Sequence, residues 1–408
     1  MKIAIVTSSF YPVIDGVTVA VFNRLKYLSK LGHQAIVFCP DYSALAGIYP
    51  NWQDYRGEIL PGITVVSLPS KPALGLDFER DVTRKSYSLV VAELNSFQPD
   101  LIHVDEAERL TCCFLNKPGI EYARQHNIPC VAFFHTNYLE YLDDYFQLPW
   151  QLNRGLKAFL GQLFTRIYNS YDLTLVSSRL TYSKLTTQGI NNLCCSELLG
   201  IDKKQYQQVQ PTGNFWQKKY HLAGLESKIK LIFVGRLTPD KGWDFFFQVI
   251  KQLAPETLTN LALIVVGEGD YRSKIATELD SLSSQVHFLG RVDPAEIPQL
   301  LVNSDILVSN SEKETRGLAI IEAGAAGIPV IAPRAGGIID TVVDGENGLL
   351  YQPKQPADFI AKLKLLVSVP ELRQAMGTKA QAKVQQLDWQ QTTDSLVRIW
   401  QQQIAQRS

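Results

Sequence analysis

Short apolar runs alternate with amphipathic stretches of helical length along almost the whole chain. Parallel strands are buried on both faces and need a crossover helix between them, so this alternation predicts repeated βαβ units and an α/β fold with doubly wound parallel sheets. In the first half, the expected strands span residues 2–7, 34–39, 64–68, 101–104, 130–134 and 173–176. The helices expected between them lie near 17–31, 79–97, 110–125, 149–171 and 179–187. In the second half, the expected strands span 230–234, 262–266, 286–289, 306–309 and 330–332, and a last helix covers 389–406.

The length of the chain sets the expected number of domains. At 408 residues it exceeds the size at which a single hydrophobic core keeps growing, so two domains are expected. We expect one Rossmann-like domain at 1–202 and a second at 229–385, joined by a polar linker at 203–228 and followed by a helical segment at 386–408. Two such domains place the ligand site in a central cleft outside the carboxyl ends of both sheets.

Charge and cysteine content exclude several classes of protein. Lysine plus arginine total 40, as do aspartate plus glutamate, so no net field recruits nucleic acid. None of the six cysteines forms a C-x-x-C pair, which fits buried free thiols in a reducing compartment better than a zinc site or a disulfide framework. The apolar run at 1–7 is too short for a signal peptide, and no apolar run reaches transmembrane length. We therefore expect a cytoplasmic protein that binds no nucleic acid.

The most informative segment is 305–329. Its apolar start predicts a buried strand that ends in a polar loop carrying Glu314, and Gly317 opens a short helix rich in alanine and glycine. A helix N-terminus in this position presents free N–H groups and a positive dipole end to an anion. Glu322 lies about one turn into the helix, where a carboxylate needs hydrogen-bond donors such as sugar and ribose hydroxyls. The structural alternative is a helix-capping Glu314 followed by an unrelated Glu322.

Suggestive residues also follow several other predicted strands. Each has a structural alternative, because a glycine can serve a plain turn, a histidine can be buried and satisfied, and cations can be solvated. They nevertheless share one position, since each stands at the carboxyl end of a predicted strand. In chain order these residues are Gly16, His135, Gly235, Arg236, Lys241 and Gly267. Gly267 and Gly269 do not complete a dinucleotide fingerprint, since Arg272 occupies the place of its third glycine.

One reaction unites these residues, namely the departure of a nucleoside diphosphate from a sugar. Negative charge then grows on the leaving oxygens, where the forked guanidinium of Arg236, the compact charge of Lys241 and the amides of Gly317 and Leu318 can bind. Preorganised donors of this kind are each worth about 3–4 kcal/mol in a dry site. No convincing D-x-D pair is present, the nearest candidate being the polar pair at 143–144, so we expect no metal and no cofactor besides the nucleotide sugar.

Taken together, the motifs resemble retaining glycosyltransferase family 4, whose members have the GT-B fold. The family's E-x7-E signature matches Glu314 and Glu322, and its G-R-x4-K-G element matches 235–242. Its N-terminal glycine loop matches Gly16, and its histidine after a central strand matches His135. The likeness runs along nearly the whole chain. Any one of these motifs is weak alone, but together they are specific.

The resemblance implies a role for each matching residue. A basic pair and the helix amides hold the diphosphate, Glu322 binds the ribose, and Glu314 contacts the donor sugar. The residues with implied catalytic roles are Glu314, His135, Arg236 and Lys241. The implied donor-binding residues are Gly16, Gly235, Arg236, Lys241, Gly267, Arg291, Val292, Glu314, Gly317, Leu318 and Glu322. The family's usual donors imply uridine as the base, in the form of a UDP-sugar.

The resemblance also implies a mechanism and a path for the tail. Anomeric configuration is retained, and because no residue stands out as a covalent nucleophile, front-face displacement is favoured, with the departing phosphate deprotonating the acceptor. The helix after Trp389 is implied to cross back onto the first domain. Arg316 departs from the family, whose members usually carry an aromatic or aliphatic residue there, and it could place a cation near the donor or acceptor.

The acceptor implied by the resemblance is a lipid, a sugar or a small molecule. The segments 134–136 and 334–340 look like the subgroup that makes sulfoquinovosyl and other glycosyl lipids. The expected helix at 149–171 carries aromatics, leucines and cations that suit peripheral contact with the cytosolic face of a membrane, the alternative being a packed helix with its cations in water. Two rival functions are a GT-B sugar-nucleotide epimerase and a non-catalytic sugar-nucleotide binder.

Overall fold

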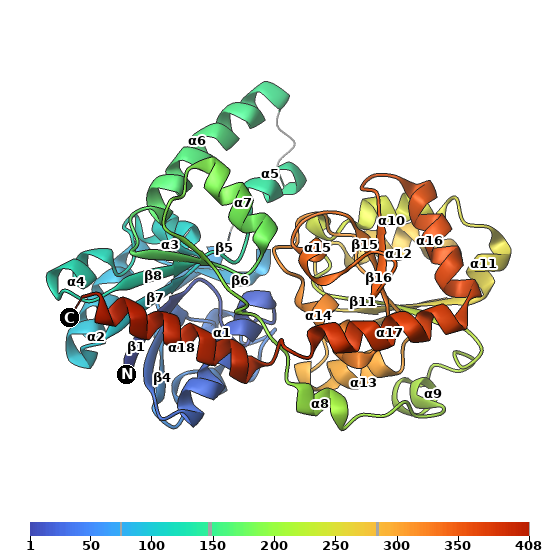
Figure 1. Cartoon of the computed structure of the whole chain (residues 1–408), viewed down its shortest axis with the longest axis horizontal. Coiled ribbons are helices and arrows are strands. Elements are labelled where there is room, and N and C mark those ends of the chain that lie inside the picture. The colour runs from blue at the N-terminus through green and yellow to red at the C-terminus, as the bar shows by residue number, and fades with distance from the viewer. Residues whose placement is uncertain (74–75, 146–148, 283–284, 408) are drawn as a thin grey trace. The chain divides into compact units, whose positions relative to one another are not determined.

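The computed structural model describes residues 1–73, 76–145, 149–282 and 285–407. The chain forms two compact units, one made of Met1–Leu199 with Trp389–Ser408 and the other of Gly200–Asp388 (Figure 1). Each unit is built on a largely parallel sheet with connecting helices, so the predicted pair of Rossmann-like α/β domains is confirmed.

In the first unit, the strands of the main sheet follow the order β10-β9-β8-β7-β1-β2-β4-β3. Neighbours are parallel except at one edge, where β3 pairs antiparallel with β4. The strands are β1 (Lys2–Thr7), β2 (Gln34–Pro40), β3 (Gly57–Leu60), β4 (Ile63–Leu68), β7 (Leu101–Asp105), β8 (Cys130–Phe133), β9 (Leu173–Val176) and β10 (Leu193–Cys195). The α-helices are α1 (Gly16–Lys30), α2 (Tyr87–Phe97), α3 (Ala107–Phe114), α4 (Ile120–Gln125), α5 (Tyr138–Tyr145), α6 (Trp150–Tyr168), α7 (Arg179–Gln188) and α18 (Trp389–Ala405).

The sheet of the first unit separates two hydrophobic cores, because successive strand residues point to opposite faces. In β1, Ala4 and Val6 enter one core, whereas Ile3 and Ile5 enter the other. Trp400 of α18 is fully buried in the second of these cores, and α18 lies along α1 (Figure 1). Burying one large apolar side chain stabilises a fold by roughly 1.5–3 kcal/mol, so α18 is an integral part of the first unit.

The second unit has a parallel sheet of order β13-β12-β11-β14-β15-β16. Its strands are β11 (Ile229–Val234), β12 (Leu261–Val266), β13 (Val286–Gly290), β14 (Ile306–Val308), β15 (Val330–Pro333) and β16 (Gly348–Tyr351). Its α-helices are α8 (Lys203–Gln207), α9 (Phe215–Tyr220), α10 (Trp243–Ile250), α11 (Pro255–Thr259), α12 (Arg272–Glu278), α13 (Ile297–Val302), α14 (Leu318–Ala326), α15 (Ile338–Thr341), α16 (Pro356–Ser368) and α17 (Pro370–Val384). Here too β11 feeds two cores, with Ile232 on one face and Leu231 and Phe233 on the other.

The predicted linker at 203–228 is wrong, because the segment belongs to the second unit. Tyr206, Trp216 and Leu225 are buried in its core, and the Trp216 indole N–H donates to the Asn303 carbonyl oxygen at 3.0 Å. The many glutamines and lysines between these apolar side chains hide a packed segment behind a linker-like composition.

Two predicted helices of the first unit also differ from the structure. Residues 79–82 of the predicted helix 79–97 instead belong to β6 (Leu76–Val82), which pairs antiparallel with β5 (Ser70–Ala73). The predicted helix 110–125 is split into α3 and α4 around Gly119. Gly119 has φ +78°, and a Cβ there would lie 2.7 Å from the Cγ2 of Ile102, so this turn requires glycine.

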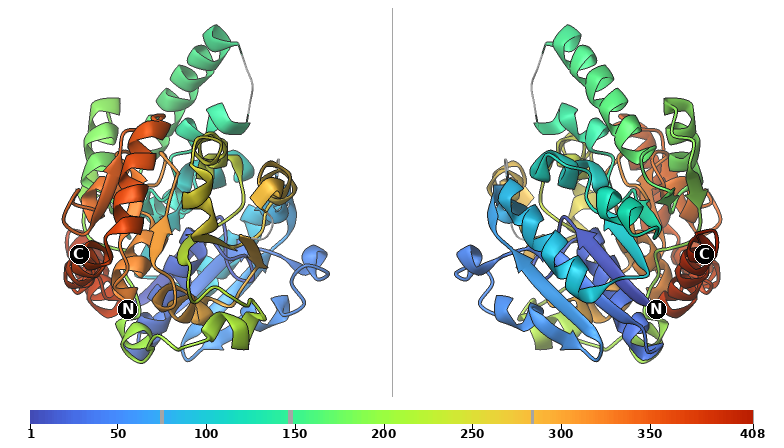
Figure 2. Two further views of the ribbon diagram at one scale, coloured as in Figure 1. Left: turned by 90° about the vertical axis from the view of Figure 1, so that its right-hand side faces the viewer. Right: turned by 90° about the vertical axis from the view of Figure 1, so that its left-hand side faces the viewer.

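Several surface features bear on function. Figure 2 shows α6 extending out from the first unit, with α5 packed near it. In the described part of the chain, no helix is both long and apolar enough to cross a bilayer. Cys39 and Cys130 are buried free thiols as predicted, but Cys112 and Cys195 are exposed.

Candidate active site

Two glycine turns meet at the carboxyl ends of β11 and β12. Gly235 has φ +148° and Gly267 has φ +131°, and a Cβ on Gly267 would lie 1.9 Å from the carbonyl oxygen of Gly235. Gly269 is also packed against a backbone, because the carbonyl oxygen of Leu237 would be 2.4 Å from an added Cβ. The glycines predicted from their strand-end positions thus allow two loop backbones to pack directly against each other, which places Arg236 on a fixed turn.

Lys241 and Glu314 form an ion pair at the edge of this sheet. The Lys241 Nζ donates to Glu314 Oε1 at 2.7 Å, and the two side chains are 24% and 19% exposed. Burial lowers the pKa of Lys241, but the carboxylates of Glu314 and Asp240 outweigh it and raise that pKa, while the nearby Arg236 opposes them. Lys241 and Arg236 from one loop and Glu314 from another therefore lie near one another, and their role in donor binding stays a prediction.

The loop carrying Glu314 is fixed by close backbone contact with residues 336–337. The Gly337 N–H donates to the Glu314 carbonyl oxygen at 2.7 Å. A Cβ on Gly337 would lie 1.8 Å from the carbonyl oxygen of Thr315, and one on Gly336 would lie 2.4 Å from that of Glu314. A side chain at either position would displace the loop, so these two glycines set the position of Glu314. No sequence pattern assigns them this role.

Arg316 is buried and faces Asp340 of α15, with Nη1 3.7 Å from Oδ2. The hypothesis of an extra cation beside the donor or acceptor therefore needs correction, because a carboxylate offsets this charge. The pair instead joins the Glu314 loop to α15.

Glu322 lies on α14, whose N-cap is Gly317 with φ +77°. The side chain is half-buried, and within the described ranges no hydrogen bond or ion pair engages it. Burial raises the pKa of Glu322 to about 7. When it is ionised, this carboxylate can accept hydrogen bonds from a ligand's hydroxyl groups. It follows a helix N-terminus that is suited to an anion.

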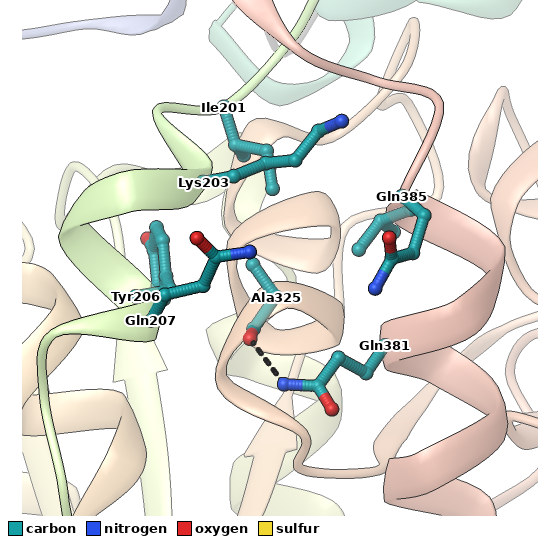
Figure 3. A pocket seen from close by; sticks show the side chains of 8 residues that line it. Ile201, Lys203, Tyr206, Gln207, Ala325, Gln381 and Gln385 are labelled. Carbon is teal, nitrogen blue, oxygen red and sulfur yellow. Dashed lines mark hydrogen bonds between the residues drawn. The ribbon is translucent and has the colours of Figure 1, made fainter.

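The helix α14 is held from behind by α17. A Cβ on Gly377 of α17 would lie 1.9 Å from the Gly327 carbonyl oxygen, so the two helices touch through their backbones. Gln381 donates to the Ala325 carbonyl oxygen at 3.3 Å at the floor of a small pocket between α8, α14 and α17 (Figure 3). This pocket is lined mainly by glutamine and aliphatic side chains, and we assign it a structural role in supporting α14.

The remaining donor-site predictions also fall at strand ends or helix starts of the second unit. Arg291 and Val292 directly follow β13, the former exposed and the latter partly buried against a core. Leu318 is the first residue of α14 and packs on the same core. Their positions agree with the sequence, while the role of Arg291 and Val292 at the base stays a prediction.

In the first unit, His135 follows β8 and is hydrogen-bonded to Asp105 at the end of β7. His135 Nε2 lies 2.6 Å from Asp105 Oδ1, and His103 Nε2 lies 3.2 Å from the same oxygen. Arg24 Nη1 is 3.3 Å from Asp105 Oδ2. Burial raises the pKa of Asp105, but Arg24 and His103 outweigh it and hold that pKa well below its usual range. His103 is itself buried, which lowers its pKa to about 4.

Glu106 forms a second buried centre directly after Asp105. Its carboxylate accepts hydrogen bonds from Ser8 after β1, and from Thr136 and Tyr138 after β8. Asp105 and Glu106 were not identified from the sequence. Two acidic residues closing a strand of otherwise apolar character are the signal that could have found them, because buried carboxylates require partners.

Gly16 is the first residue of α1 and is exposed. The preceding Asp15 caps this helix, since its Oδ1 accepts the Thr18 N–H at 2.8 Å. Gly16 therefore lies at the start of a capped helix, nine residues beyond the end of β1, and its role in donor binding stays a prediction.

Two family models match the chain, one on each unit. Residues 14–193 match "Glycosyltransferase Family 4" and residues 216–383 match "Glycosyl transferases group 1". A GDP-mannose-dependent alpha-mannosyltransferase of Corynebacterium glutamicum is 28% identical over 86% of this chain and 76% of its own. A sulfoquinovosyl transferase of Arabidopsis thaliana is 26% identical over 75% of this chain and 57% of its own.

Among solved structures, a sucrose-phosphate synthase from Thermosynechococcus elongatus superposes with a TM-score of 0.78 at 19% identity, over 99% of both chains. This likeness shows the fold. Together with the two models, which between them match most of the chain, and the relatives named as glycosyltransferases, it settles the family. The chain belongs to the GT-B glycosyltransferases of family 4 and is a hexosyltransferase.

Proposed function

We propose that the protein is a retaining, metal-independent glycosyltransferase that moves a hexose from a nucleoside diphosphate to a hydroxyl group of a lipid at the cytosolic face of a membrane. The observation that carries the donor half is the Lys241–Glu314 pair, together with Glu322 on α14, the helix that follows the Glu314 loop. The cations and helix amides match a diphosphate. The two carboxylates match the hydroxyl groups of the sugar and the ribose on either side of that diphosphate.

Donor binding exchanges partners within this set. The diphosphate takes the ammonium of Lys241 and the guanidinium of Arg236, which frees Glu314 to accept hydrogen bonds from the sugar. Glu322 accepts from the ribose hydroxyls. Because Lys241 is already held in place by Glu314, little conformational entropy is lost when it turns to phosphate.

The transfer step is a front-face displacement. The bond between the anomeric carbon and the diphosphate oxygen breaks, the acceptor oxygen bonds to the same face of that carbon, and the acceptor proton passes to the departing phosphate. Lys241 and Arg236 stabilise the charge that grows on that phosphate. Trapping a sugar covalently on a side chain would contradict this mechanism.

The lipid acceptor is supported by α6. Leu152 and Phe159 on this helix are 64% and 65% exposed, which is unusual for large apolar side chains, and Arg154 and Arg166 are exposed on the same helix. Apolar and basic side chains on one extended helix suit a membrane interface. The resemblance of 134–136 and 334–340 to the subgroup that makes glycosyl lipids points to the same acceptor class.

We expect the protein to pellet with liposomes containing phosphatidylglycerol at low salt, and the variant Leu152→Ser, Phe159→Ser to lose most of this binding. The reason is that each exposed side chain would bury its apolar surface in the interface, at roughly 25 cal/mol per Å². Leu365→Ser is the matched control, because Leu365 is also exposed, at 44%, but lies on α16 of the second unit. Equal pelleting of the wild-type protein, the double variant and the control would exclude α6 as the membrane contact.

The donor half is tested by thermal shift with UDP-glucose, UDP-galactose, UDP-sulfoquinovose, GDP-mannose and NAD. A ligand at a hundredfold excess over its Kd stabilises the folded state by about 2.7 kcal/mol, which raises Tm. The resemblance predicts a uridine donor, whereas the name of the bacterial relative contains GDP-mannose, and the panel separates the two. A shift with NAD alone would refute the proposal, and donor turnover without any acceptor would indicate an epimerase.

Donor affinity is expected to fall as pH drops below 7. Burial raises the pKa of Glu322 to about 7, and ribose hydroxyls donate to the ionised carboxylate, so protonation competes with binding. The Kd should rise by up to roughly tenfold per pH unit below 7 and level off above pH 8, since one proton is linked to binding. Isothermal titration with the nucleotide sugar between pH 5.5 and 8.5 measures this. Glu322→Gln should bind the nucleotide sugar more weakly, with a Kd that does not vary with pH. If the Kd of this variant kept the pH dependence of the wild type, another group would be responsible for it.

A further inference from the structure

In the first unit, the last residue of β7 and the residue that follows it hold two successive residues after β8. Asp105 bonds the ring of His135, and Glu106 bonds the hydroxyl of Thr136. All four side chains lie at the carboxyl edge of one sheet. Asp105 and Glu106 are 0% and 1% exposed, so both carboxylates are removed from solvent and depend on these contacts.

The hydrogen-bond inventory of this cluster sets the tautomer of His135. Arg24 and His103 keep Asp105 ionised, and an ionised carboxylate can only accept hydrogen bonds. His135 Nε2, at 2.6 Å from Asp105 Oδ1, must therefore carry a proton and donate it. The neutral ring then has Nδ1 as its acceptor atom. Beside this pair, His103 Nδ1 lies 3.3 Å from the indole nitrogen of Trp400, and His103 Nε2 lies 2.9 Å from Arg24 Nη1 and 3.2 Å from Asp105 Oδ1.

The backbone at Glu106 supports a functional role for this arrangement. Glu106 has φ 58° and ψ 56°, a left-handed conformation that is unfavourable for a residue with a side chain. It is held there by three hydroxyl donors from two other strand ends, namely Ser8, Thr136 and Tyr138. Unfavourable backbone conformations that the surroundings enforce are concentrated at functional sites.

We propose that Asp105 and Glu106 are positioning residues that present His135 to the substrate in a single orientation, with Nε2 protonated and Nδ1 as the hydrogen-bond acceptor. This inference rests on the proposed function and on the catalytic role that the family resemblance implies for His135. It adds that the imidazole accepts a hydrogen bond from a substrate hydroxyl through Nδ1 and does not donate one. It also makes the chain of contacts from Trp400 through His103 and Asp105 part of the active site's support.

The first test needs no activity. In protein labelled with ¹⁵N-histidine, the His135 signals are assigned by their loss in His135→Gln, and long-range ¹H–¹⁵N correlation then reports which ring nitrogen carries the proton. We expect the Nε2–H tautomer above pH 8. A protonated Nδ1 in the wild-type protein overturns the inference, and it does so whether or not any donor binds.

The second test separates positioning from donor binding. Asp105→Asn is expected to lower kcat for release of nucleoside diphosphate by about 10–100-fold, as for other residues that orient a functional histidine. Its Kd for the nucleotide sugar should stay within about twofold of wild type, because the residues proposed to bind the diphosphate and the ribose lie in the second unit. Asp100→Asn, at the exposed opposite end of the same strand, is the control with wild-type kcat.

Thr136→Val provides a variant without a buried charge change, in case Asp105→Asn leaves Arg24 unpaired and does not fold. It removes the hydrogen bond from Thr136 to Glu106. We expect its kcat to fall by about threefold to tenfold, because one charge-assisted hydrogen bond is lost while the fold is retained. Wild-type kcat in Thr136→Val, or in a folded Asp105→Asn, counts against the inference. Absence of donor binding in the wild-type protein instead counts against the proposed function.

Discussion

Lys241→Ala is expected to reduce sugar transfer by about 10²–10³-fold in kcat/KM, because it removes a preorganised cation from the departing diphosphate. The same change strands Glu314, whose carboxylate loses its 2.7 Å partner and is left to repel the phosphate. We therefore expect both a weaker Kd for the nucleotide sugar and a lower kcat. Initial rates of nucleoside diphosphate release, with dioleoylglycerol in mixed micelles as the acceptor probe, measure the second quantity.

Lys251→Ala is the matched control for this experiment. Lys251 lies in the same unit and also pairs with a glutamate, Glu278 at 2.9 Å, but it is 66% exposed and lies outside the strand-end site. An exposed pair contributes about 0–1 kcal/mol, so the control should keep wild-type kinetics and nearly wild-type Tm. If both variants lost activity equally, the effect of Lys241 would reflect a general loss of lysine charge.

Gly337→Ala is expected to abolish detectable donor binding while the protein stays folded. The added methyl would lie 1.8 Å from the Thr315 carbonyl oxygen, a distance that forces one of the two backbones to move. This methyl would press against the Glu314 loop. When the loop moves, the hydrogen bond from the Gly337 N–H to the Glu314 carbonyl oxygen is lost. Positioning errors of about 1 Å cost on the order of 10²-fold in rate, so any transfer that remains in this variant should also be slow.

Isothermal titration and circular dichroism together check this prediction, the first for donor affinity and the second for the fold. Gly213→Ala is the control, because no atom lies within 4 Å of a Cβ added there. Donor affinity unchanged in Gly337→Ala would show that the Glu314 loop adapts to displacement and that these glycines do not set its position.

The sequence predicted the strands well because a buried parallel strand is a continuous apolar run. The expected strand 2–7 and the observed β1 (Lys2–Thr7) coincide, and strand-end residues such as Lys241 and Glu314 could be found by position alone. The hairpin of β5 and β6 and the packed segment 203–228 were missed, because their polar residues obscure the few apolar side chains that decide where they lie.

The supporting residues were missed for a different reason. Asp105, Glu106 and Gly337 act through contacts with residues 30, 30 and 23 positions away in the sequence, and no local pattern encodes such pairs. A glycine at φ −72°, as Gly337 is, gives no conformational signal either, since any residue can adopt that backbone. Its requirement for glycine comes entirely from the neighbouring loop.

The route of the chain through its two units has a consequence for biosynthesis. The second unit is one continuous segment, Gly200–Asp388, whereas the first needs Trp389–Ser408 as well as Met1–Leu199. On the ribosome, all of the second unit is synthesised before Trp400, so the first unit carries an uncovered apolar core until α18 has emerged. Domains fold as they are completed, and exposed apolar surface favours aggregation. The first unit is therefore completed after the second, and a nascent chain lacking α18 would present that unfilled core to chaperones.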